Sequence, residues 1–139
     1  MLNLMKMAAT ALMLTVAGGA LAAAESAKDA RVYFITPQDG ETVTGPVSIK
    51  FGLSGMGVAP AGVERANTGH HHLIIDAPLP SLDQSVPSDE HYRHFGGGQT
   101  ETTIELAPGE HTLQLLMGDQ LHRPHSSAVF SDVITITVK

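Results

Sequence analysis

The histidines are the residues of this chain best suited to chemistry. The sequence has eight histidines and no cysteine, and three of the histidines are consecutive, His70, His71 and His72. The apolar run Leu73 to Ile75 follows them and predicts a β-strand. Side chains alternate along a strand, so His70 and His72 share one face and His71 takes the other. Imidazole is a good ligand for copper, zinc and nickel, so this pair can bind a transition metal.

The triplet also has an ordinary interpretation as the polar entry of a strand, partly hydrogen-bonded. If Leu73 and Ile75 face the core, His71 shares their face. We then expect His71 to be a buried, hydrogen-bonded histidine. His70 and His72 lie on the opposite face in this interpretation, and they are the candidate ligands.

Further candidate ligands lie later in the chain. Residues 119–125 contain two imidazoles and a carboxylate, and two more histidines precede them in the segment 91–94. A cluster of this kind indicates a metal site, and the alternative is a polar surface loop. The predicted metal ligands are His70, His72, His91, His94, Asp119, His122 and His125.

Other site chemistries fit the sequence less well. The absence of cysteine excludes blue-copper sites and thiolate zinc sites. The glycine run 96–98 lacks the lysine of a phosphate-binding loop, and no Gly-x-Ser-x-Gly motif is present. Met117 is predicted to pack in the core, whereas Met56, between two glycines, could add a soft ligand for copper. We identify no catalytic residue and expect a protein that is not an enzyme.

The elements that must position these residues are predicted to be strands. Short alternating runs lie between clusters of Gly, Pro and Asp, which is typical of all-β proteins. Ser88 to Phe95 is predicted to form one helical turn capped by Ser88. The fold class predicted is an immunoglobulin-like antiparallel β-sandwich of six or seven strands. The six clearest strands are Val32–Ile35, Val47–Leu53, His70–Asp76, Thr100–Leu106, His111–Met117 and Val133–Val138.

The order of these strands predicts two separate groups of histidines. Successive strands of such a sandwich run in opposite directions, so their connections alternate between two ends. This places His70, His72 and His111 near one end, and the histidines of 91–94 and 122–125 near the other. The prediction depends on the connection 77–99 containing no strand, because one additional strand reverses the assignment.

The first 24 residues have the layout of a secretory signal peptide. Lys6 precedes an apolar run at 8–17 and Ala-x-Ala sequences at 20–24. The run is shorter than the roughly 20 residues that cross a bilayer, so we expect no membrane anchor. Cleavage between Ala22 and Glu25 would release residues 25–139, a single domain, to the periplasm or the medium. Without Lys6, seven basic side chains face fourteen acidic ones, a net charge of −7, which disfavours nucleic acid as a partner.

Four segments of the chain resemble one known family. They are GHHHLIID at 69–76, HFGGGQTE at 94–101, PGEHTLQL at 108–115 and GDQLHRPH at 118–125. In this order they resemble the bacterial family named domain of unknown function 4399, over about Val47 to Val138. The resemblance implies a small exported β-sandwich and implies no particular reaction.

Two functions remain open from the sequence. The first is an exported domain that binds copper or zinc through its clustered histidines. Copper is favoured by an oxidising compartment and by its place at the top of the Irving–Williams order. The alternative is a module of the cell envelope that uses no cofactor and recognises a protein or a glycan through its long loops.

Overall fold

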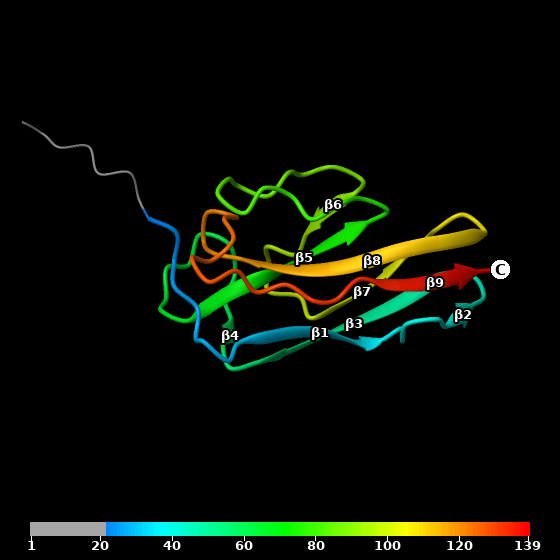
Figure 1. Ribbon diagram of the computed structural model, residues 1–139, viewed down its shortest axis with the longest axis horizontal. Helices are drawn as coiled ribbons and strands as arrows, with labels where there is room; N and C mark the ends of the chain where they lie inside the picture. Colours follow the sequence, from blue (N-terminus) through cyan, green and yellow to red (C-terminus); the bar gives the residue numbers. More distant parts are fainter. Residues whose placement is uncertain (1–21) are drawn as a thin grey trace, which may run out of the picture.

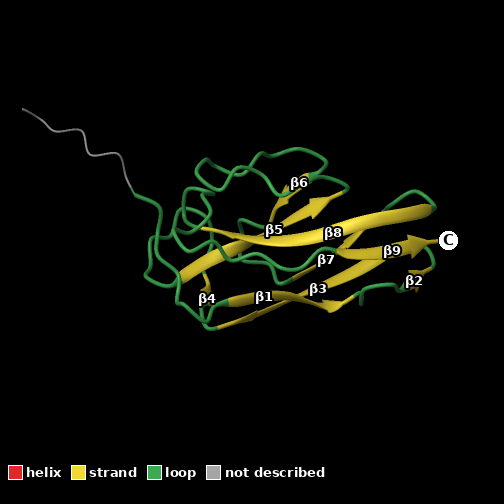
Figure 2. Cartoon of the chain, in the orientation of Figure 1, coloured by secondary structure: helices red, strands yellow, loops and turns green. Residues whose placement is uncertain are grey.

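The chain folds into two packed β-sheets (Figure 1; Figure 2). The computed structural model describes residues 22–139, so all but the last three residues of the predicted signal peptide, 1–24, lie outside the described residues. A three-stranded sheet has the order β1-β3-β7, and a six-stranded sheet has the order β2-β9-β8-β5-β4, with β6 also paired to β5. The strands are β1 (Arg31–Thr36), β2 (Thr42–Val43), β3 (Val47–Ser54), β4 (Gly57–Val58), β5 (Thr68–Ile75), β6 (Tyr92–His94), β7 (Glu101–Ile104), β8 (Gly109–Gly118) and β9 (Ile134–Val138). The predicted all-β sandwich is confirmed.

No helix within residues 22–139 is long and apolar enough to cross a membrane.

One main core fills the space between the two sheets. Strand β3 alternates buried Val47, Ile49 and Phe51 with exposed Ser48 and Lys50, as its sequence predicts. Strand β8 contributes its own alternate residues from the other sheet, and β9 does the same. The inward-facing residues of these two strands are Leu113, Leu115, Met117, Ile134, Ile136 and Val138. Met117 is therefore a packing residue, as predicted.

Strand β5 is buried on both faces, as is the second half of its neighbour β8, from Leu113 to Gly118. Every residue of β5 from Gly69 to Ile75 is buried. Leu73 and Ile75 belong to the main core, whereas Ile74 packs on the outer face in a small cluster with Val86 and Leu116. The long connection after β5 supplies Val86 and covers the outer face (Figure 1). The histidines on that face are therefore removed from solvent.

The connection between β5 and β7 contains a strand, so the predicted helical turn at Ser88–Phe95 is wrong. Asp89 Oδ1 accepts hydrogen bonds from the backbone N–H groups of His91 and Tyr92, which makes a tight turn and starts β6. Strand β6 then runs antiparallel to β5, with His94 opposite His72. This additional strand reverses the order of connections, and the prediction of two separate histidine groups is also wrong.

His71 faces the main core, as predicted, but neither of its ring nitrogens has a hydrogen-bond partner among the described residues. Its ring lies against Phe51, with 4.9 Å between centroids. Burial lowers the pKa of His71 to about 4. The folded protein therefore keeps this imidazole neutral at pH values where the unfolded chain takes up a proton.

His71 should make the fold sensitive to acid. Because its pKa is lower in the folded state, its contribution to stability is complete above the unfolded value of 6.5 and is lost as the pH falls from 6.5 towards 4. The loss should be on the order of 3 kcal/mol, and His71→Leu should remove it. Urea unfolding at pH 7 and at pH 4.5, with a chelator present, measures the difference. Equal acid losses in both proteins would contradict this prediction.

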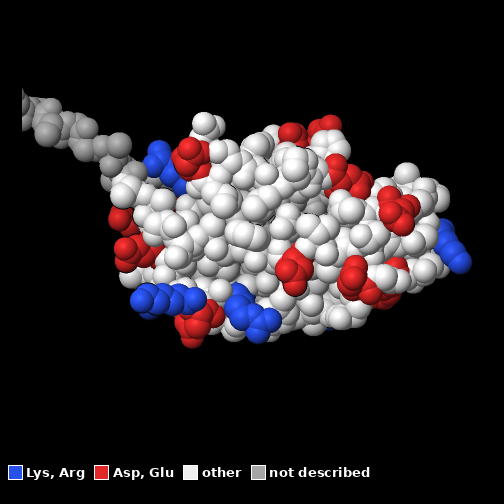
Figure 3. Space-filling model, viewed as in Figure 1, with Lys and Arg blue, Asp and Glu red and all other residues white. Residues whose placement is uncertain are grey.

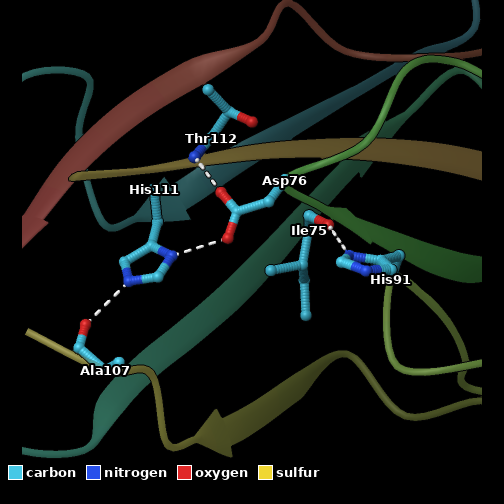
Figure 4. Close-up of polar contacts among 6 residues, drawn as sticks. All are labelled: Ile75, Asp76, His91, Ala107, His111 and Thr112. Atoms are coloured by element: carbon cyan, nitrogen blue, oxygen red, sulfur yellow. Dashed lines mark hydrogen bonds and ion pairs between the residues drawn. The ribbon is translucent and has the colours of Figure 1, made fainter. Parts of the chain in front are cut away.

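The far end of β5 is held by a histidine and a carboxylate (Figure 4). Asp76 Oδ2 lies 2.6 Å from His111 Nδ1, and Asp76 Oδ1 accepts a hydrogen bond from Thr112 N. His111 Nε2 lies 2.7 Å from the carbonyl oxygen of Ala107, to which it donates. Both nitrogens of this ring are therefore engaged, and the hydrogen bond to Asp76 raises the pKa of His111.

The His111 contact should weaken in alkaline solution. Since the folded-state pKa is raised, the contact stabilises the fold fully below pH 6.5 and is lost as the pH rises through the raised value. We expect His111→Gln to cost about 1 kcal/mol at pH 6 and less at pH 9. Thermal unfolding of both proteins at the two pH values measures this. A cost that is the same at both would count against a protonated His111.

Candidate metal centre

Four imidazoles from three parts of the chain meet on the outer face of β5. His70 and His72 come from β5, His94 from β6, and His122 from the loop that follows β8. Their neighbouring ring centroids lie 4.4 to 4.7 Å apart. Strand register brings them together, because β5 places His72 opposite His94 on one side and His70 opposite Gly118 of β8 on the other. We call these four residues the four-histidine cluster.

A shared hydrogen-bonding nitrogen lies at the centre of this cluster. His122 Nδ1 lies 2.9 Å from His70 Nε2 and 3.0 Å from His94 Nδ1. His94 Nε2 donates to the carbonyl oxygen of Pro87 at 2.6 Å, so Nδ1 of a neutral His94 carries a lone pair. With all rings neutral, no choice of tautomers gives each of these two contacts a hydrogen of its own, because His94 Nδ1 has none to donate.

The spacing of these nitrogens matches that of ligands around one metal ion. Two imidazole nitrogens bound at about 2.0–2.1 Å are separated by about 2.9 Å at a right angle and by about 3.4 Å at a tetrahedral angle. The 2.9 and 3.0 Å contacts of His122 lie at the lower end of this range. One nitrogen each from His70, His72 and His122 also lies within 4.8 Å of the other two, a group that could hold a metal ion.

The base of the cluster is buried. His70 and His72 are fully buried, and His70 Nδ1 and both nitrogens of His72 have no hydrogen-bond partner among the described residues. Burial, together with the neighbouring imidazoles, lowers the pKa of His70 to about 4 and that of His72 to about 2. His122 is half-buried, and its pKa is lowered for the same reasons. These rings therefore remain neutral, which is the form that binds metals.

The backbone of β8 passes close to the ring of His72 at Gly118, and this allows the four-histidine cluster to form. A side-chain carbon added to Gly118 would lie 2.4 Å from His72 Cε1, so only glycine leaves room for that ring. The loop after Gly118 turns sharply at His122, whose φ is 59°, and so returns the chain to β5. Nothing in the sequence indicates that Gly118 or the Pro87 carbonyl contributes to the site, because both act through the backbone.

The other predicted ligands lie outside the four-histidine cluster. His91 Nδ1 donates to the carbonyl oxygen of Ile75 near the far end of β5 (Figure 4). His125 Nε2 donates to the carbonyl oxygen of Thr68, and Asp119 accepts hydrogen bonds from backbone N–H groups. Met56 packs against the main core. Of the seven predicted ligands, the structure brings four together.

Comparison with known proteins identifies a family. The family model described as domain of unknown function (DUF4399) matches residues 49–139. Among solved structures, an endo-beta-1,4-mannanase from Thermotoga petrophila aligns with 18% sequence identity and a TM-score of 0.47, over 83% of this chain and 21% of that chain. A search of curated proteins found no match. The family model covers most of the chain and all four histidines of the cluster, so the protein belongs to the domain of unknown function 4399 family.

Proposed function

We propose that this protein binds one divalent transition-metal ion, zinc or copper, with His70, His72 and His122 as ligands and His94 as the fourth. The observation that carries the proposal is the convergence of the fully buried His72 imidazole with those of His70 and His122, whose nitrogens lie within 4.8 Å of one another. Within residues 22–139 the only polar contact of the His72 ring outside the cluster is with the backbone of Leu116. An unsatisfied buried polar group costs about 1–3 kcal/mol, and a bound ion removes that cost. Buried unsatisfied groups of this kind call for a ligand.

His71 is the instructive comparison within the same triplet. Its nitrogens are also buried and unpartnered, but its ring lies against Phe51 on the inner face, away from the other imidazoles. Burial alone therefore does not make a metal site. His72 differs because the ring centroids of His70, His94 and His122 lie 4.6, 4.4 and 5.7 Å from its own. One of its nitrogens also lies within 4.8 Å of nitrogens of His70 and His122. Convergence of donors is what supports metal binding on the outer face.

His94 has the hydrogen bond that a metal-binding histidine needs. Histidines that bind metals usually donate their second ring N–H to a carboxylate or a backbone carbonyl, which fixes the tautomer and the ring orientation. His94 Nε2 donates to the carbonyl oxygen of Pro87, and its Nδ1 faces His122. This arrangement presents the Nδ1 lone pair to the centre of the cluster.

The ligand chemistry favours Zn(II) or Cu(II) over Cu(I). Thioether and thiolate ligands select Cu(I), whereas imidazoles suit zinc and divalent copper. The chain has no cysteine, and Met56 and Met117 both pack with the main core. The acidic side chains spread along the surface in Figure 3 also favour the approach of a cation.

Replacing the clustered histidines should abolish tight binding. We expect His72→Ala and His122→Ala each to weaken Zn(II) or Cu(II) binding tenfold or more, because each loses one metal bond. His125→Ala and His71→Leu are matched controls, since both remove a buried histidine outside the cluster. Isothermal titration of the untagged protein measures the affinities. Parent binding in the micromolar range or weaker, or equal losses in the controls, would overturn the proposal.

The proposal includes export, and it assigns binding rather than catalysis to the domain. The pattern of residues 1–24 supports export, and no catalytic residue set is evident in the sequence. Expression of the full chain should yield a mature protein beginning between Ala23 and Glu25. Intact-mass analysis of the secreted or periplasmic fraction determines the first residue. A cytoplasmic product that keeps residues 1–22 would contradict export.

A further inference from the structure

Asp119 is a buried carboxylate in the loop that carries His122. It is 1% exposed and is the first residue after β8. Its Oδ1 accepts hydrogen bonds from Leu121 N at 2.8 Å and from Arg123 N at 3.0 Å. Its Oδ2 accepts from Ala24 N at 3.3 Å. Three backbone N–H groups therefore occupy this carboxylate.

The backbone of Asp119 completes the turn around His122. The N–H of His122 donates to the carbonyl oxygen of Asp119 at 2.9 Å, and the N–H of Asp119 donates to that of Arg123 at 2.8 Å. Together with the two bonds to Oδ1, these contacts close the loop into a ring of hydrogen bonds. His122 lies at its tip in a left-handed conformation that residues other than glycine rarely adopt. The carboxylate stabilises this unfavourable conformation and so determines where the imidazole lies.

The other carboxylate oxygen connects this loop to the segment Ala24–Ala27. The carbonyl oxygen of Ala24 accepts a hydrogen bond from Ser126 N at 2.9 Å. The hydroxyl of Ser26 donates to the carbonyl oxygen of Ser127, and Ala27 N donates to Asn67 Oδ1, just before β5. In the chain before cleavage, the segment therefore bridges the loop of His122 and the strand entry that carries His70; after the proposed cleavage the contacts of Ser26 and Ala27 would remain.

We propose that Asp119 is a positioning residue of the metal site, which holds His122 in place. The inference rests on the proposed function. Asp119 acts through the two hydrogen bonds that its Oδ1 accepts from the backbone on either side of His122. Fixing a ligand before the metal arrives avoids the entropic cost of ordering the loop on binding.

Two substitutions test the carboxylate. Asp119→Ala removes both hydrogen bonds to Oδ1, whereas Asp119→Asn keeps one side-chain oxygen as an acceptor for the turn. We expect a tenfold or greater loss of Zn(II) affinity in Asp119→Ala and a loss of a few fold in Asp119→Asn. Asp76→Ala is the matched control, since Asp76 also accepts a backbone N–H bond but lies at the far end of β5.

A double-mutant cycle with His122→Ala distinguishes positioning from general stability. If Asp119 acts through His122, Asp119→Ala should change Zn(II) affinity less than twofold once His122 is absent. An equal loss in both backgrounds would show an effect that does not pass through His122 and would refute the inference. Should Asp119→Ala fail to fold, the same cycle with Asp119→Asn gives the answer.

Hydrogen exchange in the mature protein tests the link between the turn and metal binding. Zn(II) should slow exchange at the amides of Leu121 and Arg123, which donate to Asp119 Oδ1, because coupling between two sites is reciprocal. The slowing should disappear in Asp119→Ala. A parent protein that binds Zn(II) tightly without protecting these amides would overturn the positioning role and leave the metal site standing. A parent that binds no Zn(II) would overturn both proposals.

Discussion

The burial of both faces of β5 is the constraint on which the rest of this structure depends. Sandwich strands ordinarily face the core on one side and solvent on the other. The loops that follow β5 and β8 cover its outer face and bury His70 and His72 there, whereas His71 is buried between the two sheets. Burial lowers the pKa of His71, so we expect it to reduce stability in acid. His70 and His72 keep neutral imidazoles beneath the covering loops.

The pairing of β5 with β6 and β8 then brings histidines from separate parts of the chain together. The register between β5 and β6 places His94 beside His72, and that between β5 and β8 brings the loop of His122 over His70. None of these contacts needs a long, flexible side chain to reach across a gap. Main-chain pairing holds His122 Nδ1 2.9 Å from His70 Nε2 and 3.0 Å from His94 Nδ1, so little further ordering would be needed if an ion bound.

The sequence predicts the strands well because alternation is a local signal. The inward residues of β3, β8 and β9, the burial of His71 and the pairing of His70 with His72 on one face all follow from it. Strand β6 escaped prediction because its three residues, Tyr92–His94, carry no alternation that can be recognised. Because this strand was not predicted, histidines that are in contact were assigned to opposite ends of the sandwich. The end at which a connection lies depends on the number of strands that precede it. The contribution of Gly118 could not be seen either, because it depends on the space around His72.

Two carboxylates at opposite ends of the β5–β8 pair explain why the histidines have different tasks. Asp76 and Asp119 each accept backbone N–H groups and close the chain where a strand ends. Asp76 also takes the nearby imidazole as a partner, so both nitrogens of His111 are bonded and that ring serves the fold. Asp119 accepts hydrogen bonds from backbone N–H groups, and the ring of His122 contacts its histidine neighbours instead. A histidine of this chain is therefore structural where a carboxylate and a carbonyl bond both of its nitrogens, as in His111, and it could serve a metal where its nitrogens face other imidazoles, as in His122.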